Sequence, residues 1–175
     1  RIVDLTTGLA GPYCSKLLVD SGAEVVKVEP PDGDPMRRWS ASDGCIPEGR
    51  DSAYFEFLNA GKQSMVADLR TDLGRLQVLE LLEGADVLLE DLEPGGLDRI
   101  ALGSEVLNQS NPRLATVSLV TFGAGGPWSN RPADEFTLQA LVGSTDARGL
   151  PGEMPISVGG RLGDILLGAM TAPLA

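Results

Sequence analysis

Hydrophobic residues fall along the chain in two alternating patterns, short apolar runs and apolar positions spaced three or four residues apart. The short runs predict β-strands over residues 2–5, 23–29, 64–69, 86–92 and 114–121. The wider spacings predict α-helices over residues 12–21, 71–83, 94–100, 104–109 and 134–141, with a last helix from residue 164. Because strands alternate with helices, the pattern predicts an α/β fold with a mostly parallel sheet.

Residues that favour turns and helix ends refine this prediction. Gly8 and Gly11 follow the first strand and predict a tight turn, after which Pro12 suits the first position of a helix. Ser104 is expected to cap the amino end of a later helix. Residues 114–121 are almost continuously apolar, which is typical of a parallel strand that is buried on both faces.

The composition fits one packed domain. The chain has 175 residues, of which 42% are hydrophobic and 22% charged. No apolar stretch approaches the ~18 residues that a membrane-spanning helix needs, so neither such a helix nor wholesale disorder is expected. The first residue falls inside a predicted strand and the last inside a predicted helix, so we expect a fragment of a larger domain.

Charge and cysteine content narrow the partners and the compartment. Lys and Arg number 14 against 25 Asp and Glu, a net charge of −11, and so acidic a surface repels nucleic acid. Cys14 and Cys45 lie far apart, form no C-x-x-C motif and follow no secretory signal. The sequence therefore favours a cytoplasmic protein that binds no nucleic acid, membrane or metal.

The sequence contains no histidine. This excludes Ser-His-Asp and Cys-His catalytic sets, H-E-x-x-H zinc sites and an imidazole general base within these residues. Any chemistry must rest on carboxylates, lysine, tyrosine, hydroxyl groups or backbone amides.

Three segments carry candidate binding residues, each with a plain structural alternative. Gly8 and Gly11, with Glu29 after the next strand, resemble an incomplete nucleotide-binding fingerprint, although a tight turn explains them better. Arg38, beside another arginine and a tryptophan, could bind phosphate or adenine, or stand in a solvated loop. Arg99 follows a glycine turn at a strand end, where it could bind phosphate or pair with neighbouring acids.

Asp164 is the strongest candidate for catalysis. It follows a glycine-rich run, residues 159–163, at an expected helix start, where free amides and the helix dipole favour an ionised carboxylate. An ordinary N-cap aspartate explains the same placement. Asp134 and Glu135 stand at another expected helix start, and such acids are more often caps than catalysts.

Taken in order, these motifs resemble the class III CoA-transferases of the CaiB/BaiF type, the family of formyl-CoA transferase, carnitine CoA-transferase and α-methylacyl-CoA racemase. The resemblance covers essentially the whole chain. It rests on five short motifs in register: Leu9-Ala-Gly-Pro-Tyr13, Gly22-Ala-Glu-Val-Val-Lys-Val-Glu-Pro-Pro31, Glu90-Asp-Leu-Glu-Pro-Gly-Gly-Leu-Asp-Arg99, Gln139-Ala140 before Gly143, and Gly163-Asp164.

The resemblance implies a Rossmann-like open sheet with helices on both faces, and CoA transfer from an acyl-CoA donor to a carboxylic acid. Asp164 would be the nucleophile, forming an acyl-aspartyl anhydride and then an aspartyl-CoA thioester, and Glu135 would assist it. Coenzyme A, as a substrate, would contact residues spread along the chain: Leu9, Ala10, Arg38, Ala67, Asp91, Leu92 and Arg99.

Three positions differ from the usual family pattern. Asp91 stands where the family usually has asparagine, which would put an extra negative charge beside the CoA site and weaken binding of that polyanion. Glu135 replaces a frequent aspartate. Asp134 stands where the racemase branch carries its histidine base, which argues against a conventional racemase.

Family members are about twice as long as this chain and form interlocked homodimers. Residues 1–175 would therefore be a truncated large domain, with the small second domain and much of the acyl specificity outside the chain. An acyl-CoA racemase or epimerase on the same scaffold remains an alternative, as does a silent homologue that binds CoA or only oligomerises. A nicotinamide-dependent dehydrogenase is a distant further alternative.

Overall fold

A computed structural model describes residues 1–40 and 44–171 of the chain. Five parallel strands form one sheet in the order β3-β2-β1-β4-β5. Their bounds are β1 Ile2–Asp4, β2 Val25–Glu29, β3 Gln63–Val66, β4 Val87–Glu90 and β5 Ala115–Ser118. The chain runs outward from β1 to β3 and then returns to the other side of β1. The carboxyl ends of β1 and β4 therefore flank the point where the winding reverses, the usual ligand position in such sheets.

Helices connect the strands, which confirms the predicted open α/β fold. The helices that cover the sheet are α1 Ala10–Asp20, α3 Asp72–Glu83 and α5 Ser104–Ser110. Further helices lie in the connections: η1 Pro35–Arg38, α2 Ala53–Asn59 and α4 Gly96–Arg99. After β5 come α6 Glu135–Leu141, η2 Asp146–Arg148 and α7 Leu162–Thr171.

Apolar side chains on both faces of the sheet are buried. Val3 packs on one face with Val78 of α3 and Leu107 of α5. Its neighbour Ile2 packs on the other face with Cys14 of α1. Because successive side chains of a strand point to opposite faces, β1 contributes to both cores, and helices cover both faces as expected.

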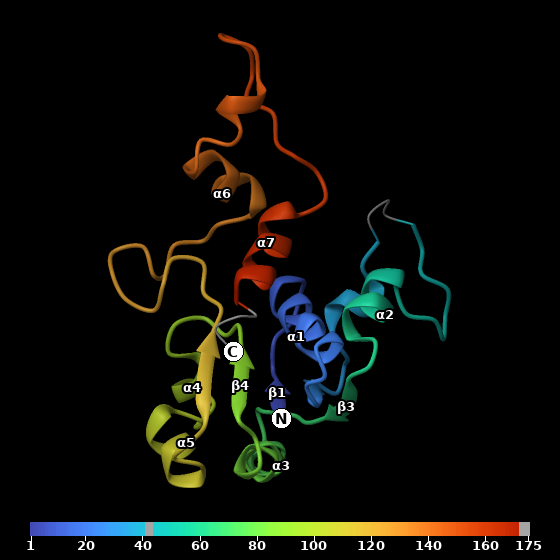
Figure 1. The fold of residues 1–175 in the computed structure, drawn as a ribbon, viewed down its shortest axis with the longest axis vertical. Coiled ribbons are helices and arrows are strands. Elements are labelled where there is room, and N and C mark those ends of the chain that lie inside the picture. Colours follow the sequence, from blue (N-terminus) through green and yellow to red (C-terminus); the bar gives the residue numbers. More distant parts are fainter. Residues whose placement is uncertain (41–43, 172–175) are drawn as a thin grey trace.

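The last part of the chain extends beyond the carboxyl edge of the sheet (Figure 1). α6 and η2 project away from the strands, and α7 then returns to lie beside α1. Ile165 of α7 packs against a cluster that includes Leu9 and Phe55. The turn after β1 and the amino end of α7 are thereby brought to the same side of the molecule.

Pro12 and Ser104 do not take the positions at helix starts that the sequence predicts for them. α1 begins at Ala10, so Pro12 is its third residue, where a first-turn N–H has no helical partner for a proline to remove. Gly11 packs so tightly on Thr6 that a Cβ there would lie 2.2 Å from its hydroxyl oxygen. Ser104 is the first residue of α5, and the position before it is taken by Gly103.

The burial predicted for residues 114–121 was also wrong. β5 covers only Ala115–Ser118, and three of its four residues are exposed. β5 is an edge strand with one neighbour, so helices protect its side chains less than those of β4, which is buried throughout. An apolar run predicts a strand but does not give its place in the sheet.

Two further properties concern the cysteines and the lengths of the helices. Both cysteines are free, Cys14 buried and Cys45 exposed. Within residues 1–40 and 44–171, no helix has the length and apolar character required to cross a bilayer.

Candidate active site at the carboxyl edge of the sheet

The turn after β1 is fixed by a buried acid. Asp4 ends β1 and is fully buried. Its Oδ1 accepts a hydrogen bond from the Thr6 backbone N–H at 2.9 Å, and its Oδ2 accepts one from the Ser15 hydroxyl at 2.5 Å. The carboxylate thus joins the start of the turn to the helix that follows it.

Two lysines with buried side chains donate hydrogen bonds to backbone carbonyl oxygens in and after the same turn. Lys27 of β2 donates to the carbonyl oxygen of Thr6 and lies 3.0 Å from an oxygen of Asp34. Lys62, just before β3, donates to the carbonyl oxygen of Pro12 at 3.0 Å and lies 3.3 Å from Asp4 Oδ2. The turn is therefore tied at both ends to neighbouring strands.

Burial and the neighbouring charges shift the pKa values of Asp4 and Lys62. Burial would raise the pKa of Asp4, but Lys27 and Lys62, with two hydroxyl donors, outweigh it and hold the pKa below its usual range. Burial lowers the pKa of Lys62 to about 8, and the attraction of Asp4 only partly opposes that effect. Lys62 therefore keeps its proton, and its hold on the turn, at neutral pH.

Asp91 lies at the winding reversal between β1 and β4. Its Oδ2 accepts a hydrogen bond from the Thr7 backbone N–H at 2.8 Å, which links the loop after β4 to the turn after β1. Burial raises the pKa of Asp91 to about 6, and the nearby acids Asp4 and Glu90 add to the rise, against the Thr7 hydrogen bond and Lys27.

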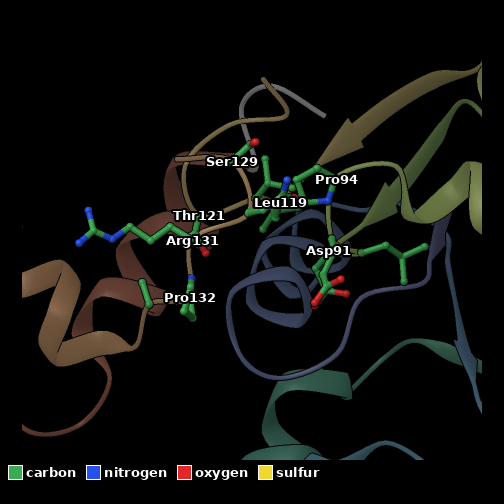
Figure 2. Close-up of a pocket in the computed structure, with 12 residues that line it drawn as sticks. Asp91, Pro94, Leu119, Thr121, Ser129, Arg131 and Pro132 are labelled. Atoms are coloured by element: carbon green, nitrogen blue, oxygen red, sulfur yellow. The ribbon is translucent and has the colours of Figure 1, made fainter. Parts of the chain in front are cut away.

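A cavity of about 320 Å³ opens beside Asp91. Three segments line it: residues 91–94, residues 119–121 and residues 129–133. Figure 2 shows Asp91 on the opposite side of the cavity from Pro132, while the Arg131 side chain extends away from it. The Arg131 guanidinium instead stacks over the Trp128 ring, 4.9 Å from its centroid.

Asp164 lies in the first turn of α7, although not at its cap. The helix begins at Leu162, two residues earlier than predicted, so Asp164 is its third residue. The N-cap interpretation was therefore wrong. Asp164 Oδ2 lies 2.6 Å from Nε of Arg161, but the contact is not aligned as a hydrogen bond, and this buried oxygen accepts none from the residues that the structure describes.

Glu135 connects α6 to the amino end of α7. Its Oε1 accepts hydrogen bonds from the Gly163 backbone N–H and from the Gln139 side-chain amide, each at 2.8 Å. A Cβ at residue 163 would lie 2.6 Å from Glu135 Oε2, so a larger residue there would displace the Glu135 carboxylate from this position. Glu135 thus contacts the residue directly before Asp164, and the structure brings these two acids together.

Asp134 acts as a helix cap. Its carboxylate accepts hydrogen bonds from the backbone N–H of Thr137 at 2.7 Å and from the Thr137 hydroxyl at 2.6 Å. Both bonds favour the ionised form and lower the pKa of Asp134. Of the two adjacent acids, one caps α6 and the other reaches α7.

The two adjacent arginines after β2, Arg37 and Arg38, also have different surroundings. Arg37 binds both oxygens of Glu29 at 2.7 Å, also binds Asp51, and lies over the Phe55 ring, so its charge is used inside the protein. Arg38 is exposed, and among the described residues its guanidinium donates to backbone carbonyl oxygens, at 3.1 Å and 3.4 Å. Its guanidinium group is therefore accessible from solvent.

Arg99 takes the plainer of its two expected arrangements. Its guanidinium donates to the Pro94 carbonyl at 3.0 Å and to a Glu93 oxygen at 3.3 Å, and both charged side chains are exposed. Arg99 follows β4 and Arg38 follows β2, and β1 runs between those strands. The two exposed arginines therefore follow the two strands that flank β1.

The remaining expected contact residues follow the same edge. Leu9 is buried under the turn, and Ala10 starts α1. Ala67 is buried just after β3, and Leu92 follows β4 with its N–H bonded to Glu90. All lie at or just beyond the carboxyl ends of strands, although Ala67 lies at the far edge of the sheet from the cavity.

Comparison with known protein families identifies the family to which this chain belongs. Residues 1–175 match the family described as CoA-transferase family III. The chain belongs to this family.

Two curated relatives and one solved structure illustrate the match. The chain is 39% identical over 160 residues to acetyl-CoA:oxalate CoA-transferase from Acetobacter aceti, covering 91% of this chain and 40% of the relative. It is 36% identical over 174 residues to succinate–glutarate CoA-transferase from Agrobacterium fabrum, covering 96% and 43%. A crystal structure of a CaiB/BaiF family protein from Brucella suis superposes with a TM-score of 0.90 at 38% identity, covering 99% and 46%. The chain thus spans about two fifths of the length of these curated relatives.

Three residues at this edge of the family III fold were missed by sequence reasoning. No pattern marked Lys27 or Lys62 as buried, because lysine at a strand or turn is usually solvated. Arg161 lay in the glycine-rich run before Asp164 but received no role. A cation three residues before a candidate nucleophile was the only signal available for it.

Proposed function

We propose that this chain carries the nucleophile and part of the CoA site of an enzyme that moves CoA from an acyl-CoA donor to a small carboxylic acid. The observation that carries the proposal is Asp164 itself, a carboxylate in the first turn of α7 with one buried oxygen that accepts no hydrogen bond from the described residues. That oxygen is ion-paired with Arg161, but an attack on a thioester would not have to break a hydrogen bond to it. Membership of CoA-transferase family III supports the same assignment.

The proposed reaction proceeds by four exchanges at carbonyl carbon. A carboxylate oxygen of Asp164 attacks the donor thioester, and the C–S bond breaks to give an acyl-aspartyl anhydride and CoA thiolate. The thiolate attacks the Asp164 carbonyl carbon, which releases the donor acid as a carboxylate and leaves an aspartyl-CoA thioester. The acceptor carboxylate attacks this thioester and expels the thiolate, which then attacks the acceptor acyl carbon and restores the Asp164 carboxylate.

The residues along the carboxyl edge fit part of a CoA molecule. CoA is a polyanion, and Arg38 and Arg99, which follow the two strands that flank β1, present exposed guanidinium groups. The cavity beside Asp91 and Leu92 has room for part of such a ligand. Asp91 opposes an anion when ionised, so the fit is best when its carboxyl group is protonated.

The capping role of Asp134 favours transfer over racemisation. An α-proton is removed by a group whose pKa lies near the working pH. The backbone N–H and the hydroxyl of Thr137 both donate to the Asp134 carboxylate and lower its pKa. Asp134 is therefore a weak base. Incorporation of deuterium at the α-carbon in D2O, at a rate comparable to transfer, would instead identify a racemase or epimerase.

We also propose that residues outside this chain supply a second, smaller domain and complete an interlocked homodimer. The chain spans 40% and 43% of two curated relatives, which leaves room for such a domain. Large apolar side chains are exposed in the last third of the chain, among them Val142, Leu150 and Met154. These side chains suit a surface that another domain or subunit covers.

The experiment is a nucleophile test on the full-length protein. Asp164→Ala should abolish CoA transfer between acyl-CoA and a panel of small carboxylic acids, and it should remove the covalent CoA adduct seen by intact-protein mass spectrometry. Asp72→Ala is the matched control, because Asp72 is an exposed acid in the first turn of α3. Wild-type turnover in the Asp164 variant would refute the role of Asp164. CoA binding without turnover in the wild type would point to a silent homologue.

A further inference from the structure

Arg161 forms an ion pair with Asp164 across the first turn of α7. The Nε and Oδ2 atoms lie 2.6 Å apart, and the two side chains are 42% and 21% exposed. The backbone of Arg161 has a φ of 52°, in the left-handed region that residues other than glycine seldom adopt. The fold therefore holds a charged side chain, in a backbone conformation better suited to glycine, directly against the candidate nucleophile.

The local charge balance is negative. Glu135 adds a second carboxylate beside Gly163, and its Oε2 is buried with no hydrogen-bond partner. Within the part of the chain that the structure describes, Arg161 is the cation that ion-pairs with Asp164. One positive charge thus stands among two negative charges when Asp164 is ionised.

The proposed reaction changes this balance at every covalent stage. As an anhydride or as a thioester, Asp164 carries no charge, so Arg161 loses its ion-pair partner. At the thioester stage the departing donor acid and the incoming acceptor acid are both free carboxylates. At the thioester stage, therefore, Arg161 is released while a free substrate carboxylate is in the site, whereas at the anhydride stages the free anion is the CoA thiolate.

We propose that Arg161 binds the reacting carboxylate of the acid substrate while Asp164 is covalently modified. This inference rests on the proposed function. Arg161 alternates between two partners: the Asp164 carboxylate in the resting protein, and the substrate carboxylate in the aspartyl-CoA stage. At the aspartyl-CoA stage the exchange keeps the net charge of the site near that of the resting protein.

The chemistry of the guanidinium group suits this role. Its five N–H donors form a planar fork, so it can bind a carboxylate with two parallel hydrogen bonds and orient it toward the Asp164 carbonyl carbon. The partial exposure of Arg161 leaves donors accessible from solvent. The ligand class is a small carboxylic acid, and the contact requires only one carboxylate.

The first test measures binding without turnover. Asp164→Asn keeps the shape of the side chain but removes its charge, and so imitates the modified state. We expect this variant of the full-length protein to bind succinate about tenfold or more tightly than the wild type, measured by calorimetry with acetate as a second probe. The double variant Asp164→Asn, Arg161→Gln should lose that gain. Equal succinate affinity in the single and double variants would overturn the proposal.

The second test separates acid binding from nucleophile positioning. Arg161→Gln should raise the KM for the acceptor acid about tenfold or more, while the KM for the acyl-CoA donor changes little. Arg161→Lys should restore part of the acceptor affinity because it restores the charge. Arg113→Gln, which changes an exposed arginine before β5, is the matched control.

The outcomes of these tests distinguish failure of the role proposed for Arg161 from failure of the proposed function. If the wild-type protein forms no covalent CoA adduct, the proposed function fails and the role of Arg161 fails with it. If the adduct forms normally and the acceptor KM is unchanged in Arg161→Gln, only the role of Arg161 fails. Slower adduct formation with an unchanged acceptor KM would show that Arg161 only positions Asp164, which also overturns the proposal.

Discussion

Asp91 accepts a hydrogen bond from the Thr7 backbone N–H at 2.8 Å, and so joins the two loops that flank the winding reversal of the sheet. The same carboxyl group lines the cavity there. An acid in this position both shapes the turn after β1 and sets the charge that a ligand meets.

Replacement of Asp91 by asparagine should change how stability depends on pH. Burial raises the pKa of Asp91 to about 6, above its ordinary value of 3.8, so the folded protein binds a proton more readily than the unfolded chain. The free energy of unfolding must then fall as the pH rises from about 3.8 to 6. Relative to wild type, Asp91→Asn should gain at most about 3 kcal/mol between pH 3.5 and pH 8, measured by denaturant unfolding.

The Asp91 prediction has a ligand-binding counterpart in the same variant. Because a negative charge is removed, Asp91→Asn should bind CoA more tightly than wild type at pH 8, and the difference should shrink toward pH 5. If the free energy of unfolding depended on pH in the same way in the two proteins, the raised pKa of Asp91 would be contradicted.

The Lys62–Asp4 pair should show strong coupling. Lys62→Met leaves the buried Asp4 carboxylate without one of its two lysines, and loss of one partner of a buried pair typically costs about 3–5 kcal/mol. The double variant Asp4→Asn, Lys62→Met should be less destabilised than the sum of the single variants. Unfolding free energies at pH 7 for all four proteins complete the cycle, and simple additivity would mean that the pair is not coupled.

The sequence predicted the arrangement of strands and helices because buried strands and amphipathic helices leave periodic apolar patterns. β4 shows this well, since all four of its residues are buried. The exposure of β5 could not be predicted, because strand order depends on contacts between distant segments. The start of α7 was placed two residues late, because its first turn contains few apolar residues that face the core.

The candidate site divided in a similar way. Asp164 and Glu135 were predicted from the family resemblance, and the structure brings them together through Gly163. Sequence alone could not show that Arg37 forms an ion pair with Glu29 while Arg38 is exposed, because the two arginines are adjacent. Lys62 was missed because its partners lie on strands and turns far away in the sequence.

Removal of the Arg99 side chain should weaken CoA binding. Among the described residues, the guanidinium donates to the Pro94 carbonyl and to an exposed Glu93 carboxylate, so a phosphate can replace these partners at small cost. Arg99→Ala should therefore raise the dissociation constant for CoA by an amount that corresponds to roughly 1–3 kcal/mol, measured by calorimetry. Arg113→Ala is the matched control, and equal affinities for CoA in the two variants would place the phosphates elsewhere.

Glu135 should act by positioning Asp164 rather than by moving a proton. The proposed exchanges pass acyl groups between carboxylates and a thiolate, and none of them requires a proton to be taken up or released. Glu135 Oε1 instead accepts the Gly163 N–H and so fixes the first turn of α7. Glu135→Gln retains an oxygen that can accept this bond, whereas Glu135→Ala leaves a donor without a partner, which costs about 1–3 kcal/mol. We therefore expect single-turnover formation of the Asp164 adduct to be roughly tenfold slower in the alanine variant, but close to wild type, with an unchanged pH profile, in the glutamine variant. A glutamine variant as slow as the alanine variant would show instead that the negative charge of Glu135 is required.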